Sequence, residues 1–279
     1  MTPATFDFLA GLVKARSGGV LMRDQGYMLE TRLASLLKRE GLPDLDALAA
    51  RLRGAGTAQL AQEMTELLTT NESSFFRDGR PFEHLRALLP ALHRARAPGL
   101  PIRIWSSACS TGQEAYSIAI TIAELGEADP GFAARRFEIL GTDITAAVVE
   151  RASAGVFSQF EVQRGLPIRT LMKRFTQEDG RWRIRPEIAA LCRFTRLNLL
   201  DDLRHLGRFD VIFCRNVLIY FDAPTKSRVL ASLAAQLVSD GTLIVGAAET
   251  AIGLSDRLRA HPTERGAYHP APEGERLRA

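Results

Sequence analysis

The chain has 279 residues, of which 46% are hydrophobic and 24% charged, so it has the composition of a folded globular protein. Its net charge of +4 is spread without a dense Lys/Arg run, which gives no ground for a nucleic-acid partner. Three cysteines at unrelated spacings exclude a disulfide framework and a zinc-ligand pattern. No signal peptide is visible, and no stretch approaches the roughly 20 apolar residues of a membrane helix. We therefore expect a cytoplasmic protein with no metal ion and no membrane insertion.

The first part of the chain, residues 5–70, has a repeating Leu/Ala/Met pattern with few β-branched residues, which is typical of helices. Glycine and proline interrupt the pattern at residues 18–19, 41–43 and 54–56. These breaks predict about four short helices, which we interpret as a separate all-α domain over residues 1–68.

A helix predicted from about Asp24 to Glu40 carries a leucine stripe and several basic residues. Arg32 and Arg39 lie two turns apart on one side of this helix, with Lys38 nearby. The pattern leaves two interpretations open: a solvated basic face, or a docking surface for an acidic helix.

Residues 69–97 are predicted to form a linker followed by a lead-in helix. A polar cluster directly precedes two adjacent phenylalanines and Arg77, and adjacent aromatic residues are unusual in a flexible linker. In the simpler interpretation, Asn71, Ser73 or Ser74 caps a helix beginning near Phe75, with both phenylalanines in the core and Arg77 on the surface. A functional segment is the alternative.

Residues 98–279 alternate between buried strand patterns and helix patterns, which predicts a parallel, doubly wound α/β sheet. The alternation breaks between residues 157 and 192, where two short strands, beginning at Lys173 and Arg181, flank a turn at 177–180 and predict an antiparallel insertion. The polar tail after Pro270 is expected to be disordered. The predicted strands are 102–104, 137–143, 192–197, 209–215, 242–246 and 267–269. Three helices are predicted in this part of the chain: one that follows Gly112, one at 145–154 and one at 224–238.

The stretch from Ile102 to Ile122 reads as a strand, a turn of small residues and a helix, which form the first half of a nucleotide-binding crevice. Apolar positions after the turn recur at helical spacing. Small side chains let the backbone approach a ligand, and Gly112 tolerates a positive φ.

Two carboxylates are placed to contact a nucleoside in this crevice. Asp143 ends the second predicted strand, where a carboxylate binds ribose hydroxyls. The turn holds a single glycine and lies farther from Asp143 than the roughly 20 residues of a dinucleotide fingerprint, so a pyrophosphate is not expected. S-Adenosylmethionine is a nucleoside ligand without a pyrophosphate. Glu114 could bind its amino group, although an acid in the first turn of a helix also suits the helix dipole.

The segment after the strand at 209–215 emerges at the same edge of the sheet, where ligands bind in such folds. Asn216 and Tyr220 are polar positions in its apolar run. Tyr220 is interpreted either as a site residue or as a core tyrosine with a hydrogen-bonded hydroxyl.

Five motifs occur in order along the chain. They are Thr-Thr-Asn-x-Ser-x-Phe-Phe-Arg at 69–77, Trp-Ser-x-Ala-Cys-Ser-Thr-Gly-x-Glu-x-Tyr-Ser-Ile-Ala at 105–119, Thr-Asp-Ile at 142–144, Asn-Leu-Leu at 198–200 and Phe-Asp-x-Ile-Phe-Cys-Arg-Asn-Val-x-Ile-Tyr-Phe at 209–221. Together they resemble the chemotaxis receptor methyltransferase family, CheR, from about residue 5 to residue 270. This resemblance favours the functional interpretation of the residues above.

The resemblance implies transfer of a methyl group from S-adenosylmethionine to glutamate side chains on the cytoplasmic helices of chemoreceptors, with S-adenosylhomocysteine as product. It implies a Rossmann-like methyltransferase sheet with a small antiparallel β-subdomain, preceded by an all-α domain. Arg77 and Tyr220 match the residues nearest the transferred methyl group, and Arg32, Lys38 and Arg39 match a receptor-facing surface. The implied cofactor contacts are Asn71, Ser73, Arg77, Glu114, Asp143, Asn198, Leu199, Asn216 and Val217.

Departures and alternatives limit this interpretation. The β-subdomain loop at 176–180 is shorter than in members that bind a receptor C-terminal pentapeptide, so no such tether is expected, and we expect a monomer. A nucleic-acid methyltransferase is less well supported, because amino-methylating members of that class usually carry an Asn/Asp-Pro-Pro-aromatic motif after the fourth strand. A non-catalytic cofactor-sensing regulator would be expected to lose Arg77 or Tyr220, and another protein methyltransferase remains an alternative.

Overall fold

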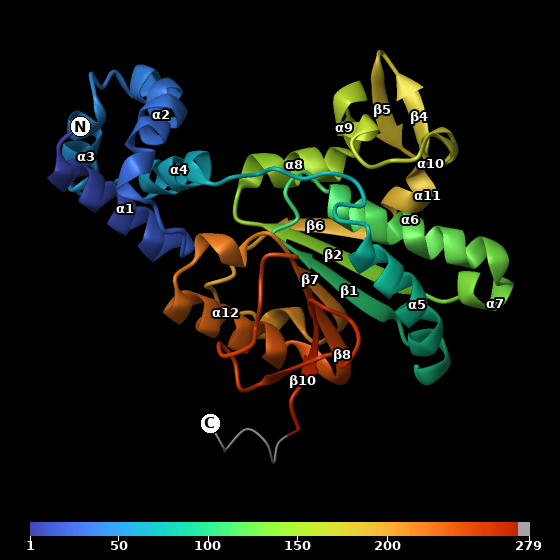
Figure 1. Ribbon diagram of the computed structural model, residues 1–279. Coiled ribbons are helices and arrows are strands. Elements are labelled where there is room, and N and C mark those ends of the chain that lie inside the picture. Colours follow the sequence, from blue (N-terminus) through green and yellow to red (C-terminus); the bar gives the residue numbers. More distant parts are fainter. Residues whose placement is uncertain (273–279) are drawn as a thin grey trace. The chain divides into compact units, whose positions relative to one another are not determined.

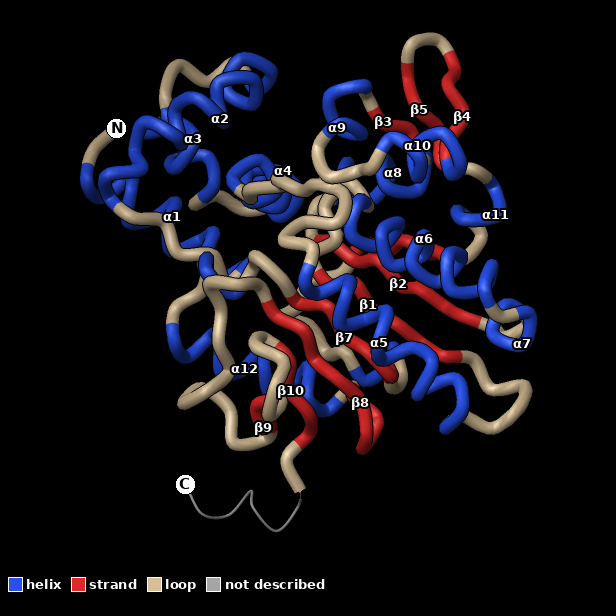
Figure 2. Tube along the Cα trace, turned by 45° about the vertical axis from the view of Figure 1, so that its right-hand side comes forward, coloured by secondary structure: helices blue, strands red, loops and turns tan. Residues whose placement is uncertain are grey.

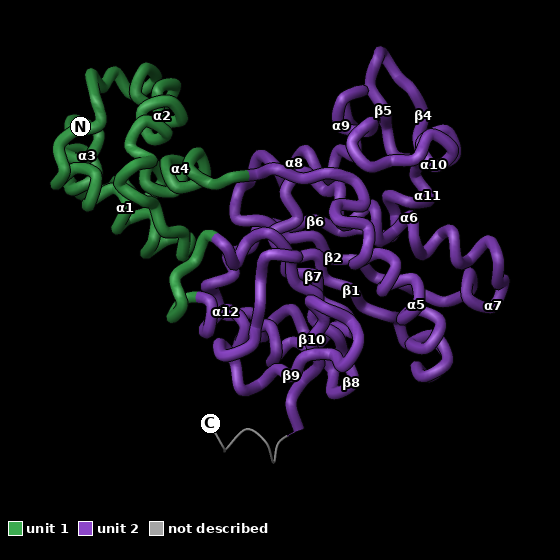
Figure 3. The backbone as a smooth tube through the Cα atoms, viewed as in Figure 1, with its two compact units in different colours: residues 1–70, 220–225 green, residues 71–219, 226–279 purple. Residues whose placement is uncertain are grey.

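The computed structural model describes residues 1–272 and contains two compact units (Figures 1 and 3). Unit 1 comprises residues 1–70 and 220–225, and unit 2 comprises the remainder. The tail predicted to be disordered lies almost entirely outside the described residues. Within residues 1–272, every helix is too short or too polar to cross a membrane.

Unit 1 is a helical bundle, which confirms the helices predicted for this part of the chain. Gly18 and Gly41 end the first two helices in left-handed conformations, with φ of 80° and 65°. Leucines such as Leu9, Leu29 and Leu48 are buried in a common core. The elements are α1 (Pro3–Ser17), η1 (Arg23–Gln25, a 3₁₀ turn), α2 (Gly26–Glu40), α3 (Leu45–Leu52) and α4 (Ala58–Leu68).

Residues 220–225 belong to unit 1 although they are distant from it in sequence. The Val20 amide donates a hydrogen bond to the Tyr220 carbonyl oxygen (2.8 Å), and Lys14 forms an ion pair with Asp222 (2.6 Å). Unit 1 is therefore not formed by N-terminal residues alone.

Unit 2 is built on a sheet that, within residues 1–272, has seven strands in the order β6-β2-β1-β7-β8-β10-β9 (Figure 2). The first five of these are parallel, as predicted. The prediction of a wholly parallel sheet is wrong at one edge, where β10 runs antiparallel to β8 and β9. No crossover helix separates β8 from β10, so the chain returns in the opposite direction. The strands are β1 (Ile102–Ser107), β2 (Phe137–Asp143), β6 (Cys192–Arg196), β7 (Phe209–Cys214), β8 (Leu237–Val245), β9 (Leu258–Ala260) and β10 (Ala267–Pro270).

Alternate side chains of β1 face opposite sides of the sheet. Ile102 and Ile104 share a core with α5 and α6, whereas Trp105 packs against Phe209. The predicted helix at 224–238 ends earlier, because β8 begins at Leu237 and pairs with β7. The helices are α5 (Arg80–Ala95), α6 (Gln113–Ala128), α7 (Pro130–Ala133), α8 (Ala146–Ala154), α9 (Gln159–Gln163), α10 (Ile168–Arg174), α11 (Pro186–Ala189) and α12 (Ala223–Ala235), with 3₁₀ turns η2 (Arg204–Leu206) and η3 (Leu218–Tyr220).

The insertion forms a separate antiparallel sheet in the order β3-β5-β4, which confirms the predicted hairpin. Asp179 and Gly180 form its two-residue turn, both with positive φ (49° and 74°). The prediction is wrong for Lys173 and Arg174, which end α10 instead of starting a strand. A two-residue strand such as β3 is too short to show alternation, so it was not predicted. The strands are β3 (Val156–Phe157), β4 (Phe175–Glu178) and β5 (Arg181–Ile184).

The helix predicted to begin near Phe75 is wrong, because residues 75–79 form a tight turn before α5. Phe76, Asp78 and Gly79 have φ of 48°, 67° and 62°, which no right-handed helix accommodates. Phe75 is fully buried, as expected for a core residue, and packs edge-on against two phenylalanines of the β-subdomain. The aromatic residue therefore anchors the turn that carries Arg77.

Candidate active site

The turn between β1 and α6 lies at the carboxyl edge of the sheet, as predicted, and has an unusual backbone. Ala108, Ser110 and Gly112 adopt φ of 55°, 50° and 94°. The Cys109 amide donates to the carbonyl oxygen of Thr142 on the neighbouring strand (2.8 Å). Because two of the three left-handed residues are not glycine, tertiary contacts must hold this turn in place.

Asp143, at the end of β2, supplies one of these contacts. Its carboxylate accepts hydrogen bonds from the backbone amides of Ser110 (2.9 Å) and Thr145 (3.0 Å), and the residue is 6% exposed. Burial raises the pKa of Asp143 above its ordinary value, while the amide hydrogen bonds oppose that shift. The carboxylate thus links the β1–α6 turn to the amino end of α8.

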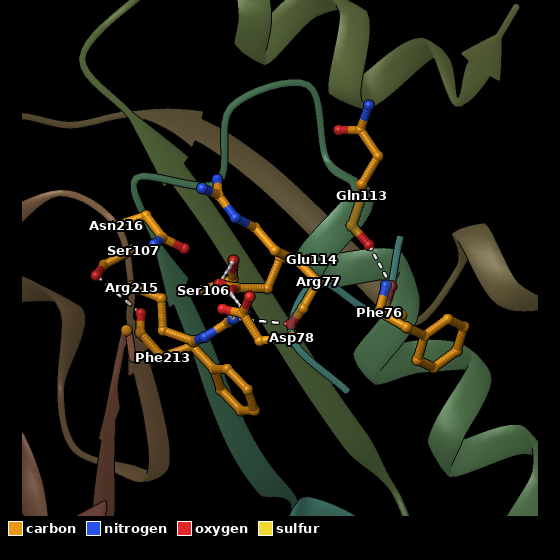
Figure 4. A network of polar contacts seen from close by, with 12 residues as sticks. Phe76, Arg77, Asp78, Ser106, Ser107, Gln113, Glu114, Phe213, Arg215 and Asn216 are labelled. Carbon is orange, nitrogen blue, oxygen red and sulfur yellow. Dashed lines mark hydrogen bonds and ion pairs between the residues drawn. The ribbon is translucent and has the colours of Figure 1, made fainter. Parts of the chain in front are cut away.

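An ion-pair network centred on the buried Arg215 joins three segments at this edge of the sheet (Figure 4). The Arg215 side chain, directly after β7, is 1% exposed. It donates to the carboxylates of Glu114 (2.8 Å) and Asp78 (2.7 Å) and to the carbonyl oxygen of Arg77 (2.8 Å). Glu114 also accepts a hydrogen bond from Ser106 (2.7 Å). Sequence reasoning missed the role of Arg215, because its partners are far apart along the chain.

The turn at 75–79 is also held against α6. The Phe76 amide donates to the hydroxyl of Ser117 (2.9 Å), which itself donates to the Gln113 carbonyl oxygen (2.7 Å). Gly165 approaches Phe75 so closely that a Cβ at this position would collide with the Phe75 carbonyl group. The backbone around Arg77 is therefore fixed from three directions.

The Arg77 side chain itself is half-buried and forms no ion pair with any other residue that the structure describes. Its guanidinium donates to the Glu72 carbonyl oxygen (3.3 Å), and no carboxylate within residues 1–272 pairs with it. Asn71 and Ser73 are also half-buried, and the Asn71 carbonyl oxygen accepts a hydrogen bond from the Ser110 hydroxyl (2.7 Å). The structure thus brings the segment first interpreted as a linker into contact with the β1–α6 turn.

The loop after β7 is organised by Glu249, which sequence reasoning also missed. The Glu249 carboxylate accepts hydrogen bonds of 2.6–3.3 Å from four backbone amides, those of Asn216, Val217, Ile219 and Gly246. Asn216 has a φ of 58°, a left-handed conformation that asparagine tolerates better than most residues. Nothing in the local sequence around Glu249 distinguishes it, so only the fold reveals this role.

Three further residues that the sequence predicted to belong to the site lie in segments that come after β6 and β7. Asn198 and Leu199 come after β6, where Leu199 is buried and the Asn198 side-chain oxygen accepts a hydrogen bond from the Leu200 amide (3.0 Å). Tyr220 ends η3, and its side chain is 39% exposed, which excludes the core-tyrosine interpretation.

Two of the three basic residues predicted to dock a partner have partners within unit 1. Arg32 donates to the carbonyl oxygens of Leu68 (3.1 Å) and Thr69 (2.8 Å), which satisfies the open end of α4. Arg39 forms an ion pair with Glu63. Lys38 is exposed and forms no ion pair within the described part of the chain.

The carboxyl edge of unit 2 fits a nucleoside better than a dinucleotide. It presents a turn of small residues, an acid after β2 and an acid at the start of α6, and it has one glycine where a pyrophosphate-binding loop needs several. These features fit an α/β protein that binds a nucleoside ligand such as S-adenosylmethionine at the carboxyl edge of its sheet, as methyltransferases of this fold do.

Comparison with known proteins identifies the family. Residues 4–69 match the all-alpha domain of CheR methyltransferases, and residues 71–267 match their SAM binding domain. The chain is 36% identical to chemotaxis protein methyltransferase 1 of Pseudomonas aeruginosa, covering 92% of this chain and 93% of that protein. It is 37% identical to the chemotaxis protein methyltransferase of Vibrio parahaemolyticus, covering 88% and 89%. The chain belongs to the CheR methyltransferase family, and its cofactor is S-adenosylmethionine.

Proposed function

We propose that this protein transfers the methyl group of S-adenosylmethionine to glutamate side chains on the cytoplasmic helices of chemoreceptors, which yields glutamate methyl esters and S-adenosylhomocysteine. Family membership and the relatives named chemotaxis protein methyltransferases support this activity. The observation that carries the choice of an acidic substrate is Arg77. Its backbone is fixed to Arg215, while its guanidinium has no carboxylate partner within residues 1–272.

The proposed reaction needs orientation more than proton transfer. A glutamate carboxylate is already ionised at pH 7, so it can attack a methyl carbon without a general base. The bound cofactor supplies that methyl group on a positively charged sulfur. Arg77 holds the carboxylate through two N–H groups, and we assign it a positioning role because a tightly bound carboxylate is a poorer nucleophile. Tyr220 can donate a hydrogen bond to the incoming carboxylate or face the sulfonium charge.

We assign cofactor binding to the residues at the carboxyl edge of the sheet and on the segment before α5. Glu114 would take the amino group of the methionine end, and Asp143 the ribose hydroxyls. Asn198 and Leu199 would flank the adenine. The remaining contacts are assigned to Asn71, Ser73, Arg77, Asn216 and Val217. Arg215 donates a hydrogen bond to Glu114, and Glu249 accepts hydrogen bonds from the amides of Asn216 and Val217. These bonds support the assignment, because they hold members of this set in one place.

We further propose that the receptor docks on the basic surface of α2 formed by Arg32, Lys38 and Arg39. Lys38 is expected to contribute most, because the other two already have partners within unit 1. The proposed enzyme acts as a monomer and binds neither nucleic acid nor a receptor C-terminal pentapeptide. The two-residue turn of the β4–β5 hairpin supports the last point. Micromolar binding of such a pentapeptide in a calorimetric titration would contradict it.

The decisive experiment is a transfer assay with methyl-labelled cofactor and membranes that contain the receptor. We expect label on the receptor that alkaline treatment releases, as methyl esters require. A receptor whose candidate glutamates are replaced by glutamine is the matched control and should remain unlabelled. Label that resists alkali, or equal labelling of the control, would show a different reaction.

A further inference from the structure

The side chain of Tyr220 is not held in place by polar contacts of its own. The residue is 39% exposed at the end of η3, and its hydroxyl forms no hydrogen bond with any residue in the part of the chain that the structure describes. A reacting group must nevertheless be held in a productive orientation, because a misplacement of about 1 Å costs a large part of the rate. The direction of the hydroxyl therefore depends on the backbone on either side of Tyr220.

On the amino side of Tyr220, the backbone is anchored within unit 2. The Glu249 carboxylate accepts hydrogen bonds from the amides of Val217 (2.9 Å) and Ile219 (3.3 Å). The second of these bonds is long, and the Ile219 side chain is exposed. The anchor on this side therefore weakens as the chain approaches Tyr220.

On the carboxyl side, the backbone is anchored within unit 1, to which residues 220–225 belong (Figure 3). The Val20 amide donates a hydrogen bond to the Tyr220 carbonyl oxygen (2.8 Å), and Gly19 forms an antiparallel bridge with Phe221. Phe221 is buried, so the residue directly after Tyr220 is fixed by packing as well. The connection between α1 and η1 therefore holds the backbone of Tyr220.

This contact depends on the glycine that ends α1. Gly18 has a φ of 80°, and a Cβ at this position would lie 2.9 Å from the Thr225 Cγ2 atom and 3.3 Å from the Phe221 ring. An alanine at residue 18 would therefore strain the backbone and also push against the segment that follows Tyr220.

An ion pair holds the same segment one residue farther along. The Lys14 ammonium lies 2.6 Å from the Asp222 carboxylate, which also accepts the Thr225 amide (3.0 Å) at the start of α12. The hydrogen bond from Lys14 lowers the pKa of Asp222, so the pair is ionised at neutral pH. Because the Lys14 side chain is 52% exposed, the pair contributes little to the stability of the fold. Its main effect is to fix the position of residues 220–222.

We propose that the connection after α1 positions Tyr220 for methyl transfer, with Gly18 and Lys14 as the positioning residues. The inference rests on the proposed function and deepens it, since both residues act on the reaction through the backbone of Tyr220. The unit that we propose to dock the receptor thereby also determines where a reacting side chain points.

The test measures kcat, the receptor KM, the Kd for S-adenosylmethionine and the thermal midpoint of three variants. Lys14→Gln should lower kcat about threefold with both binding constants unchanged, less than the loss of about fivefold expected when the Tyr220 hydroxyl itself is removed. Lys14→Arg keeps the positive charge and should retain most of the rate. Asp7→Asn is the matched control, because it breaks another exposed ion pair of α1, that with Arg23 (2.8 Å), which does not involve residues 220–225. It should match the wild type.

A second arm adds Gly18→Ala and combines it and Lys14→Gln with Tyr220→Phe. Gly18→Ala alone should lower kcat about fivefold, the full worth of the misplaced hydroxyl group. In the Tyr220→Phe background neither change should lower kcat further, because the hydroxyl that they position is already absent. A purely structural role would instead give losses that multiply. The Lys14 variants decide the question where Gly18→Ala does not fold.

Unchanged kcat in Lys14→Gln, losses that multiply in the double variants, or full activity of Tyr220→Phe would overturn the inference. Each of these results leaves the proposed function intact as long as the wild type forms alkali-labile methyl esters on the receptor. If the wild type forms none, the proposed function fails first and this inference fails with it.

Discussion

The central strand β7 has a strongly paired arginine near each end, and the two arginines connect different kinds of structure. At the amino end, Arg96 donates to Asp210 (2.5 Å) and to both oxygens of Asp240 (2.8 Å), and Asp210 also accepts the Arg103 amide (2.7 Å). At the carboxyl end, Arg215 binds two carboxylates and a backbone carbonyl group.

The difference lies in what each arginine holds. Arg96 joins the end of α5 to strands whose own hydrogen bonds already define their shape. Arg215 holds a turn with left-handed residues, which would not keep its conformation without external contacts. The same residue type therefore stabilises the sheet at one end and fixes the turn that carries Arg77 at the other. The predictions below test that division.

Lysine substitutions at the two arginines should show the largest contrast. In Arg215→Lys a single ammonium group cannot bind Glu114, Asp78 and the Arg77 carbonyl oxygen together, so kcat should fall roughly hundredfold, as expected for a misplacement of about 1 Å. Arg96→Lys should lower the thermal midpoint while kcat stays unchanged. Transfer assays at saturating substrates and thermal unfolding of both variants provide the measurement. A folded Arg215→Lys protein with wild-type kcat would refute the division.

The next largest effect is expected at the residue that Arg215 positions. Arg77→Lys removes the paired N–H groups that hold a carboxylate, so kcat/KM for the receptor should fall roughly thirtyfold, equivalent to about 2 kcal/mol. The exposed Arg257 serves as the control site, and Arg257→Lys should be neutral. Wild-type kcat/KM in Arg77→Lys, which keeps the positive charge, would point to general electrostatic attraction instead of a specific contact through two N–H groups.

A smaller effect is expected on the loop after β7. Tyr220→Phe removes one hydroxyl group, so turnover should slow about fivefold, the worth of one neutral hydrogen bond. Cofactor affinity, measured by calorimetry, should change little. Full activity in this variant would remove Tyr220 from the mechanism.

The smallest effect belongs to the amino end of β7. The hydrogen bond from Arg96 lowers the pKa of Asp240 in the folded protein. The pair therefore stabilises the fold at pH values above the unfolded-state pKa of about 4. This stabilisation is lost as the pH falls through the lower folded-state pKa of Asp240. Because Asp240 is more than half exposed, Asp240→Asn should cost less than about 1 kcal/mol at pH 7. Urea unfolding at pH 7 and pH 2 should show the difference between wild type and variant disappear in acid, with kcat unaffected at neutral pH.

Local pattern was sufficient for much of the fold. Helical spacing in residues 5–70, the buried runs of β1, β2 and β7 and the turn signal at Asp179-Gly180 all predicted the observed elements. Pattern failed where tertiary contacts override local preference. Residues 75–79 read as the start of a helix, yet burial of Phe75 and the hydrogen bonds of Phe76 and Arg77 hold them in a left-handed turn.

The same distinction applies to the candidate site. The sequence by itself determined which residue types follow each strand, because Glu114, Asp143 and Asn216 take their places from the strand–turn–helix alternation. Only the tertiary structure decided how they are supported. The strand order brings β1 and β7 together, so Arg215 meets Glu114 and Asp78 across more than a hundred positions of sequence, and Glu249 reaches the loop after β7. Such contacts depend on which strands become neighbours, and the burial of Arg215 strengthens its contacts. Neither property leaves a periodic pattern in the sequence.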